Sequence, residues 1–360
     1  MKNKKVAVIG TVGLPAKYGG FETLVEHLVK NLNKNFDFTV YCSSISYKNK
    51  PRTYNKVRLV YLPLSANGKS SIPYDILSII HSLFYADVIL VLGVSGAFIL
   101  PFIKIFTGKK IITNIDGLEW KRDKWGNLAK KYLKLQEKIA VNFSHNVVVD
   151  NKGIQKHVEK VYNKKSSLIA YGGDHVFKKQ LQNHTIKMFN IPKEYAFKVC
   201  RIEPENNIHV VLKAFAQTNF NLIIVGNWNN NEYGKTLKMK YKNYNNVFLL
   251  DPIYDQIKLN ELRSNCYLYI HGHSAGGTNP SLVEAMSLEL PILAFDVSYN
   301  RYTTQQEALY FKNEIELVNN LNLIQRDNTI LKINSAKMKA ISLKYYTWKL
   351  ISERYKTLLD

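Results

Sequence analysis

The sequence contains few cysteines. Only 3 of its 360 residues are cysteine, and Cys42, Cys200 and Cys266 are too far apart for a CxxC or Cys/His metal spacing. This excludes a disulfide-stabilised scaffold and a zinc ribbon, and it is typical of a protein of the reducing cytosol. Apolar residues make up 46% and charged residues 22% of the chain, which excludes an intrinsically disordered protein.

A membrane-spanning hydrophobic run is also missing. The stretch 88–103 is uncharged, but it is shorter than the about 18–20 residues that a bilayer requires. Glycines and a proline interrupt it, so we predict a buried strand, a glycine loop and a short packed helix. The opening MKNKK and the apolar residues after it predict the basic entrance of a buried strand rather than a signal peptide.

Acidic residues are scarce relative to basic ones. The chain has 50 Lys and Arg against 28 Asp and Glu, a formal net charge of +22. Such a surface attracts polyanions, which include nucleic acid, anionic lipid headgroups and phosphorylated small molecules. Charge alone does not choose among them.

Short β-branched runs alternate with helix-length segments, which predicts parallel sheets covered on both faces. The runs fall into two series that are separated near residues 172–192, so we expect two α/β domains of the Rossmann type. We place the first at 1–172 and the second at 173–344, with a carboxyl-terminal helix at 345–360 packing back toward the first. Ligands of such sheets lie beyond the carboxyl ends of the strands, here expected in a cleft between the domains. The predicted strands are 5–9, 38–41, 58–61, 88–92, 110–115 and 146–149, then 197–202, 221–225, 247–250, 267–270, 291–295 and an edge strand at 308–311.

Two glycine-containing loops follow predicted strands. The loop 10–23 carries Gly19 and Gly20 before a helix expected at 21–32, and it is either a loop with positive φ angles or a cradle for an anion or sugar. The loop 270–280 ends in Thr278, Asn279 and Pro280, a typical helix start, and Glu284 follows about one turn later. We favour a ligand site at the second loop, where a diphosphate would gain from the helix N-terminus.

Two other segments contain side chains suited to binding. Arg201, expected at the end of strand 197–202, has the planar fork that suits bidentate phosphate binding. The loop 113–125 combines acidic, basic and tryptophan side chains, which suit a sugar site but also fit a loop whose tryptophans pack locally.

The sequence resembles the GT-B glycosyltransferases of family 4, specifically the bacterial rhamnosyltransferase-like subgroup of capsule and O-antigen synthesis. The resemblance rests on the order and spacing of four motifs, GLPAKYGGFET, NIDGLEWKR, CRIEPENN and HGHSAGGTNPSLVEAM. The resemblance also rests on a carboxyl-terminal helix with Tyr346 and Trp348. It implies a GT-B architecture, in which two Rossmann-like domains face an interdomain cleft. It further implies a retaining transfer from a nucleotide-sugar donor without a metal or other cofactor.

The resemblance assigns roles to individual residues. Arg201 matches the basic residue that contacts the donor diphosphate, and Glu284 matches the second glutamate of a Glu-seven-residues-Glu motif that holds the nucleoside sugar. Asp116 is the candidate for contact with the reacting sugar or the acceptor hydroxyl, so the expected catalytic residues are Asp116, Arg201 and Glu284. The expected donor site comprises Gly19, Gly20, Arg201, Asn206, His273, Gly276, Gly277, Thr278, Asn279 and Glu284, and the expected acceptor site comprises Glu119, Trp120 and Arg122.

Two positions depart from the family pattern. The first glutamate of the motif falls on Gly276, and the lysine expected five residues after Arg201 is Asn206. Neutralisation of the diphosphate would then depend more on Arg201 and the helix N-terminus. The missing carboxylate leads us to expect a deoxysugar donor, with dTDP-rhamnose as the best candidate. No pair of carboxylates stands out for a glycosidase-like scheme, so the family's front-face substitution is expected, in which the leaving phosphate helps to deprotonate the acceptor.

The acceptor expected from the resemblance is a lipid-diphosphate-linked saccharide. Residues 121–138 are rich in lysine and form either a solvated helix or a surface that docks on an anionic leaflet, where each basic residue contributes about 1 kcal/mol. We therefore expect a cytoplasmic protein, peripheral at the inner face of the cytoplasmic membrane, that does not bind nucleic acid. The sequence leaves three alternatives open: a non-catalytic nucleotide-sugar-binding protein, a sugar-nucleotide 2-epimerase, and a basic nucleic-acid-binding protein.

Overall fold

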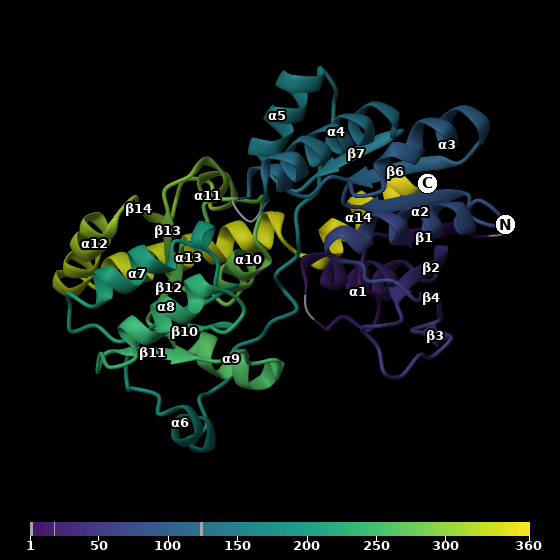
Figure 1. Cartoon of the computed structure of the whole chain (residues 1–360). Coiled ribbons are helices and arrows are strands. Elements are labelled where there is room, and N and C mark those ends of the chain that lie inside the picture. The colour runs from purple at the N-terminus through teal and green to yellow at the C-terminus, as the bar shows by residue number, and fades with distance from the viewer. Residues whose placement is uncertain (1–2, 18, 123–124) are drawn as a thin grey trace. The chain divides into compact units, whose positions relative to one another are not determined.

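The computed structural model describes residues 3–17, 19–122 and 125–360 (Figure 1). The chain forms two compact units, one of residues 1–171 together with 348–360, and the other of residues 172–347. The sequence prediction places these boundaries after residues 172 and 344. Each unit is an α/β layer structure with a mainly parallel sheet, as the alternation of apolar runs predicts.

The described residues of the first unit form an eight-stranded sheet in the order β3-β4-β2-β1-β5-β6-β7-β8. All neighbours are parallel except the short β3, which pairs antiparallel with β4. The central strands are buried on both faces, which explains their continuous Val and Ile content. The strands are β1 Lys4–Ile9, β2 Phe36–Ser43, β3 Thr53–Tyr54, β4 Val57–Leu62, β5 Val88–Leu92, β6 Lys110–Asn114, β7 Asn146–Val149 and β8 Ser167–Leu168.

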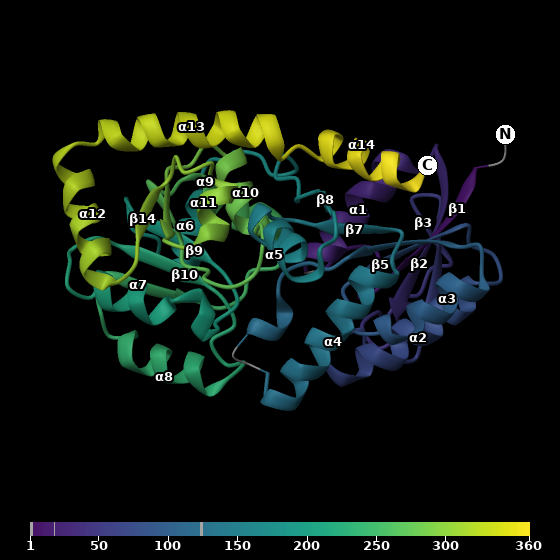
Figure 2. The same ribbon diagram turned by 90° about the horizontal axis from the view of Figure 1, so that it is seen from above.

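Helices cover both faces of this sheet. Figure 2 shows α1 and α14 on one side and α2, α3 and α4 on the other. The ring of His27 on α1 stacks on Trp348 of α14, with centroids 4.2 Å apart, and Asn31 donates to Ser352 at 2.8 Å, so the carboxyl-terminal helix belongs to this unit. The helices are α1 Gly20–Leu32, η1 Gly68–Ser70, α2 Ser71–Ser82, η2 Ala97–Ile99, α3 Leu100–Phe106, η3 Glu119–Lys121, α4 Asn127–Phe143, α5 Lys152–Tyr162 and α14 Trp348–Leu359.

The second unit has a six-stranded parallel sheet among its described residues, in the order β11-β10-β9-β12-β13-β14. Its core lies between this sheet and helices that include α7 and α12. The long helix α13 packs along α10 (Figure 2). The elements are α6 Asn183–Phe189, β9 Ala196–Val199, η4 Pro204–Asn206, α7 Ile208–Phe215, β10 Leu222–Val225, α8 Glu232–Tyr241, β11 Val247–Leu250, α9 Gln256–Ser264, β12 Leu268–His271, α10 Pro280–Ser287, β13 Ile292–Phe295, α11 Ser298–Thr303, β14 Leu309–Phe311, α12 Glu314–Arg326 and α13 Thr329–Tyr345.

The predicted strands differ from the structure at a few ends. The first strand of the second unit ends at Val199, so the prediction that Arg201 ends that strand is wrong: the arginine lies in the loop beyond it. The stretch 88–103 forms β5, a glycine loop, η2 and the start of α3, as predicted. Within the described residues, no helix is long and apolar enough to cross a membrane.

Each sheet has one point where the strand order reverses. In the first unit the chain proceeds outward on one side of β1 and then on the other side from β5, and in the second unit the reversal lies between β9 and β12. Loops after the two strands at such a point diverge and leave a crevice, which is where ligands of open α/β sheets bind. The reversals therefore select the loops after β1, β5, β9 and β12 as the positions to search for function.

A buried carboxyl group joins α2 to the loop after β5. Asp75 is 3% exposed, and a Cβ atom on Gly96 would lie 2.7 Å from the Cβ of Asp75, so only glycine permits this approach. Burial raises the pKa of Asp75 to about 8, although a hydrogen bond from the backbone of Gly96 acts to lower it. The side chain is consequently protonated across much of the physiological pH range.

This burial predicts a pH-dependent stability. Because the pKa of Asp75 is near 4 in the unfolded chain and about 8 in the folded one, folding binds a proton between these values, and stability falls as pH rises through them. Asp75→Asn removes this titration. We therefore expect the difference in free energy of unfolding, variant minus unmodified protein, to be a few kcal/mol larger at pH 8.5 than at pH 4. Urea unfolding at the two pH values measures this, with the exposed Asp37→Asn as control. An equal difference at both pH values would show that Asp75 does not titrate abnormally.

Candidate functional site

The loop after β1 is held in a conformation that requires glycine. Gly10 has φ +88°, and a Cβ atom there would lie 2.0 Å from the carbonyl oxygen of Leu92, at the end of β5. Gly19, with φ +135°, precedes α1 and is its N-cap residue, without a side-chain cap. The positive φ angles expected from the sequence are therefore present, and the loop lies at the reversal point of the first sheet.

Two glutamates that the sequence analysis missed brace this loop. Glu22 accepts hydrogen bonds from the hydroxyl of Thr11 at 2.9 Å and from the backbone of Val12 at 2.7 Å. Glu26 accepts one from the backbone of Ala16 at 2.7 Å. The Glu22 carboxylate also occupies the start of α1, because a Cβ atom on Gly19 would lie 1.8 Å from one of its oxygens, so this loop already binds an anion of its own. The signal available in the sequence was the pair of carboxylates four residues apart in the first turns of the following helix.

Asp116 lies two residues beyond β6 with φ +56°, a conformation that Asp tolerates better than most residues. Its backbone N–H donates to the side chain of Asn114 at 2.9 Å, and the Tyr171 hydroxyl donates to its carboxylate at 3.2 Å. Burial raises the pKa of Asp116, although Arg122 and the Tyr171 hydrogen bond act to lower it. The group is thus a partly buried carboxyl with a raised pKa, a profile that functional acids and bases share.

The expected acceptor residues are joined to one another and to α4. Glu119 is paired with Arg122 at 2.9 Å, and the indole N–H of Trp120 donates to Glu137 at 2.8 Å. Ammonium groups of Lys121 and Lys134 lie 5.5 and 5.3 Å from the Trp120 ring centroid. These contacts agree with local packing of the tryptophan, the simpler of the two interpretations of this loop. Asp123 and Lys124 lie outside the described residues.

In the second unit, the loops after β9 and β12 are hydrogen-bonded to each other. The side chain of Asn207 donates to the carbonyl of Gly272 at 2.9 Å, and the backbone N–H of Ser274 donates to the carbonyl of Glu205 at 2.8 Å. A Cβ atom on Gly272 would lie 2.3 Å from the carbonyl oxygen of Asn206, so glycine is needed for this approach. The two loops that the sequence analysis selected for the donor are therefore held together at the reversal point of the second sheet.

Arg201 lies in this pair of loops and is accessible. Its side chain is 47% exposed, and its guanidinium is 3.8 Å from the carboxylate of Glu203. Asn206, expected in the donor site, is buried instead, and its amide donates to the carbonyl of Arg201 at 2.6 Å. Asn206 thus shapes the loop that presents the arginine, and it does not supply the charge of the lysine that it replaces.

Glu284 is fixed by two partners that the sequence analysis missed. Its carboxylate pairs with Arg263, a 1% exposed side chain that also donates to Asn260 at 2.9 Å, and its other oxygen is 3.2 Å from His175. Burial acts to raise the pKa of Glu284, but Arg263 and His175 outweigh it and hold that pKa at about 2. Glu284 is therefore a carboxylate of fixed charge and orientation, with 16% of its side chain exposed.

The start of α10 differs from its predicted form. Asn279 occupies the N-cap position, but its side chain accepts no hydrogen bond from the helix, so the prediction of an asparagine cap is wrong in that respect. Gly277 and Thr278 are buried. Gly276 has φ +112° with open space where a Cβ atom would stand, so a side chain there would fit but would strain the backbone.

Two buried basic groups lie beside these loops. The His271 ring stacks on the ring of His273, with centroids 4.4 Å apart, and neither of its nitrogens has a hydrogen-bond partner among the described residues. Lys198 is 1% exposed, and its ammonium nitrogen likewise has no hydrogen-bond partner within the residues that the structure describes. Burial and Lys198 together place the pKa of His271 well below its usual value, so this imidazole is neutral.

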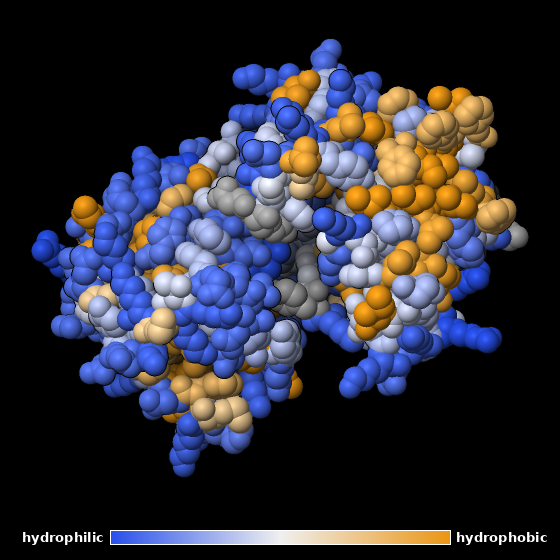
Figure 3. Space-filling model, in the orientation of Figure 1, coloured by the Kyte–Doolittle hydropathy of each residue, from blue (hydrophilic) through white to orange (hydrophobic). Residues whose placement is uncertain are grey.

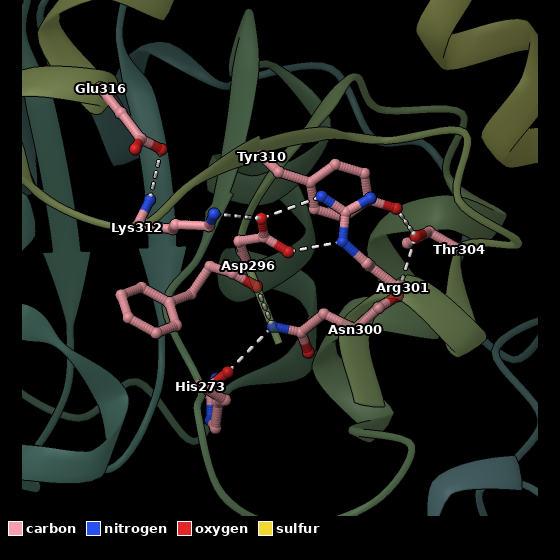
Figure 4. A network of polar contacts seen from close by, with 9 residues as sticks. His273, Asp296, Asn300, Arg301, Thr304, Tyr310, Lys312 and Glu316 are labelled. Atoms are coloured by element: carbon pink, nitrogen blue, oxygen red, sulfur yellow. Dashed lines mark hydrogen bonds and ion pairs between the residues drawn. The ribbon is translucent and has the colours of Figure 1, made fainter. Parts of the chain in front are cut away.

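A polar network supports the glycine loop from the β13 side (Figure 4). Asn300 donates both to the carbonyl of His273 at 2.9 Å and to that of Phe295 at 2.8 Å. Arg301 forms a two-pronged contact with Asp296, including a bond of 2.9 Å, and lies 4.2 Å from the Tyr310 ring centroid. The network anchors the backbone of His273. The loop leading to α10 is therefore hydrogen-bonded both to Asn300 and to the loop after β9.

Comparisons with known families agree with this division of the chain. Residues 180–336 match the family described as "Glycosyl transferases group 1", and residues 3–174 match a "Domain of unknown function (DUF1972)". Each match lies almost entirely within one of the two units, so the first unit is similar to the DUF1972 domain and the second to glycosyltransferase group 1.

Solved structures share the fold over almost the whole chain. Sucrose-phosphate synthase from Thermosynechococcus elongatus is 15% identical with a TM-score of 0.83, over 99% of this chain and 98% of that one. Anabaena HepE in complex with UDP-glucose is 14% identical with a TM-score of 0.77, over 99% of both chains. The catalytic domain of Arabidopsis thaliana starch synthase IV, bound to ADP and acarbose, is 13% identical with a TM-score of 0.70, over 100% and 99%. The fold is that of the GT-B glycosyltransferases, with Rossmann-like domains, as the sequence motifs indicate.

The Glu284 pairing predicts a second pH-dependent stability. Its lowered pKa stabilises the folded state at any pH above about 4.3, the value in an unfolded chain, and that contribution is lost as pH falls toward 2. Glu284→Gln leaves the cation of Arg263 buried, so we expect it to cost about 3 kcal/mol at pH 7 and about half of that at pH 3. Urea unfolding at both pH values measures this.

Glu289→Gln is the matched control, because Glu289 forms an exposed ion pair with Lys178 at 3.0 Å. Such pairs contribute about 0–1 kcal/mol, so this variant should unfold like the unmodified protein. Equal costs for the two glutamine variants at pH 7 would argue against a fixed Glu284 carboxylate.

Proposed function

We propose that this protein is a retaining glycosyltransferase that transfers a sugar from a nucleotide-diphosphate donor to a lipid-linked saccharide acceptor. The observation that carries the proposal is the pair of hydrogen-bonded loops at the reversal point of the second sheet. One loop carries the accessible Arg201, and the other leads to the uncapped start of α10, one turn before the Glu284 carboxylate of fixed charge. The match of this half of the chain to glycosyltransferase group 1 supports the same interpretation.

The diphosphate of the donor is assigned to Arg201 and the start of α10. The guanidinium offers a charged two-pronged donor to phosphate oxygens. Because the side chain of Asn279 does not cap α10, the positive end of that helix can interact with an anion. Gly277 and Thr278 form the buried backbone turn that leads into α10.

Glu284 is assigned to the hydroxyls of the nucleoside sugar. A carboxylate with a pKa of about 2 accepts hydrogen bonds at any physiological pH, and the contacts with Arg263 and His175 fix where it points. Hydroxyl recognition benefits from such orientation, because no side-chain freedom is lost on binding.

The donor sugar is assigned as L-rhamnose carried by dTDP. Gly276 places no carboxylate where the glycosyltransferase motif has one, and the space there is open. A deoxysugar lacks one hydroxyl, so it needs one acceptor fewer from the protein. The structural neighbour HepE is described in complex with UDP-glucose, which supports the class of donor, a nucleotide sugar, and not this particular sugar.

Transfer with retention can proceed on one face of the sugar. The bond from the anomeric carbon to the phosphate oxygen breaks, the acceptor oxygen forms its bond on the same face, and the leaving phosphate takes the acceptor proton. In this scheme the protein orients the reactants and stabilises charge. Asp116 accepts a hydrogen bond from the acceptor hydroxyl, which positions that oxygen, and Arg201 stabilises the charge that develops on the phosphate.

The acceptor is assigned to the first unit. Glu119, Trp120 and Arg122 follow β6 closely after Asp116, and the exposed lysines of α4 suit an anionic leaflet. A lipid-diphosphate-linked acceptor places the enzyme at the cytoplasmic face of the membrane as a peripheral protein.

Donor binding tests the proposal through Arg201. In a thermal-shift panel of dTDP-rhamnose, UDP-hexoses, UDP-N-acetylhexosamines and GDP-sugars, we expect dTDP-rhamnose to raise the melting temperature, since a ligand at 100 times its dissociation constant adds about 2.7 kcal/mol. Arg201→Ala should weaken that donor by about 10–100-fold, because a charge-assisted contact is lost. The control is Arg326→Ala, at the exposed end of α12.

The possible results of this panel distinguish the proposed function from its alternatives. A shift from another donor only would overturn the choice of rhamnose and leave the transferase. Release of a free 2-epimer, or binding without transfer to any lipid acceptor, would replace the transferase by an epimerase or a binding protein. No shift by any nucleotide sugar, together with salt-sensitive binding of duplex nucleic acid, would contradict the proposal entirely.

The Asp116 assignment predicts a pH profile. Asp116→Asn should lower kcat/KM by about 100-fold or more, as expected for a group that positions a reacting hydroxyl. Tyr171→Phe removes the hydrogen bond that lowers the pKa of Asp116, so this variant should remain active with the acid limb of its kcat/KM profile moved to higher pH. An unchanged acid limb in Tyr171→Phe would show that Asp116 does not control the profile.

A further inference from the structure

The first unit exposes a group of large apolar side chains on α2, η2 and α3. Phe84 is 85% exposed, Phe106 is 77% exposed, and Phe102 is 60% exposed, far more than aromatic side chains in a folded protein usually are. Figure 3 shows this group as a broad orange area where Figure 1 labels α2 and α3. We refer to it as the α2–α3 apolar face, which comprises Leu77, Ile80, Phe84, Phe98, Phe102, Ile105 and Phe106.

The elements that carry the α2–α3 apolar face are packed and hydrogen-bonded to the rest of the first unit. On α2 and the turn after it, apolar residues recur three and four positions apart, while the opposite side of the helix is buried. The backbone N–H of Phe98 donates to Gln136 of α4 at 2.8 Å, and the Tyr132 hydroxyl donates to the carbonyl of Ser95 at 2.8 Å. The close approach of Gly96 to Asp75 joins this loop to α2. The exposed side chains are therefore presented by elements that are packed against one another.

The charge around the face is mainly positive. Residues 88–115 contain no Asp or Glu, and they include Lys104, Lys109 and Lys110. The helix α4, which packs against α3, exposes Lys131, Lys134 and Lys138. The acidic residues of α2 and the turn after it are the buried Asp75 and the exposed Asp87, and the Asp87 carboxylate accepts a hydrogen bond from the backbone of Lys5 at 2.8 Å.

This combination selects one kind of partner. A second copy of the chain would bring lysines opposite lysines, and two chains of charge +22 repel each other. An anionic bilayer offers both hydrocarbon for the phenylalanines and phosphate for the lysines, and peripheral binding grows with buried apolar area plus electrostatic attraction. We propose that the α2–α3 apolar face inserts into the interfacial region of an anionic lipid bilayer, with the lysines of α3 and α4 on the headgroups.

The inference rests on the proposed function for its purpose, because an enzyme acting on a lipid-linked acceptor has to meet the membrane. It differs from electrostatic docking through α4 alone in one measurable respect: phenylalanine side chains leave water. Removal of these side chains should therefore weaken membrane binding even when every lysine is kept.

Vesicle binding tests the insertion. The 360-residue chain is sedimented with phosphatidylcholine vesicles containing 30 mol% phosphatidylglycerol and with pure phosphatidylcholine vesicles, at low and at high salt. The variant Phe84→Ser/Phe102→Ser/Phe106→Ser should bind the anionic vesicles at least about tenfold more weakly than the unmodified chain. The control variant Ile257→Ser/Ile315→Ser/Ile333→Ser changes three exposed apolar residues of the second unit and should bind like the unmodified chain. The single variant Phe106→Trp should shift its fluorescence to the blue on anionic vesicles.

Several outcomes would overturn the insertion. These are equal binding of both triple variants, a complete loss of binding in salt with no effect of the serine substitutions, or no binding of the unmodified chain. Concentration-dependent dimerisation that the Phe84→Ser/Phe102→Ser/Phe106→Ser variant abolishes would assign the face to self-association instead. Circular dichroism melting of each variant establishes that it is folded. Nucleotide-sugar thermal shifts in the same variants test the donor site separately, so failure of insertion and failure of the transferase proposal are distinguishable.

Discussion

The donor site proposed here depends on the contact between two loops of the second sheet. The loop after β9 and the loop after β12 are joined by the bonds from Asn207 to Gly272 and from Ser274 to Glu205. The approach is so close that a single Cβ atom on Gly272 would prevent it. Because these strands flank the point where the strand order reverses, the contact brings Arg201 and the entry to α10 to the same end of the sheet.

The charged groups near these loops differ in their exposure to solvent. Arg201 is half exposed and can reach a ligand, whereas Arg263 is buried and used to fix Glu284. His271 has a pKa well below its usual value because of its burial and the neighbouring Lys198, so it adds no second positive charge there, and burial also lowers the pKa of Lys198. The protein thus separates the cation available for binding from the cation that holds the carboxylate in position.

The sequence predicts the strands and the positions of the loops well, because both follow from local pattern. The run Val88–Leu92 forms β5 with the predicted bounds, and the glycine loops lie where parallel strands end. The partners of Glu284 could not be predicted in this way. Arg263 and His175 reach it from other elements, and no periodicity or motif connects them to α10. The same holds for Asn279: its position at the helix start was predictable, but the absence of a capping hydrogen bond from its side chain was not.

Hydrogen exchange in the presence of a nucleotide-sugar donor would test the central claim most directly. If the diphosphate binds where the two loops meet, backbone amides in residues 201–207 and 272–284 should exchange more slowly with donor bound, while those of the distant β11 should be unchanged. Protection that is absent from both loops, or that appears only elsewhere in the second unit, would contradict the proposed donor site.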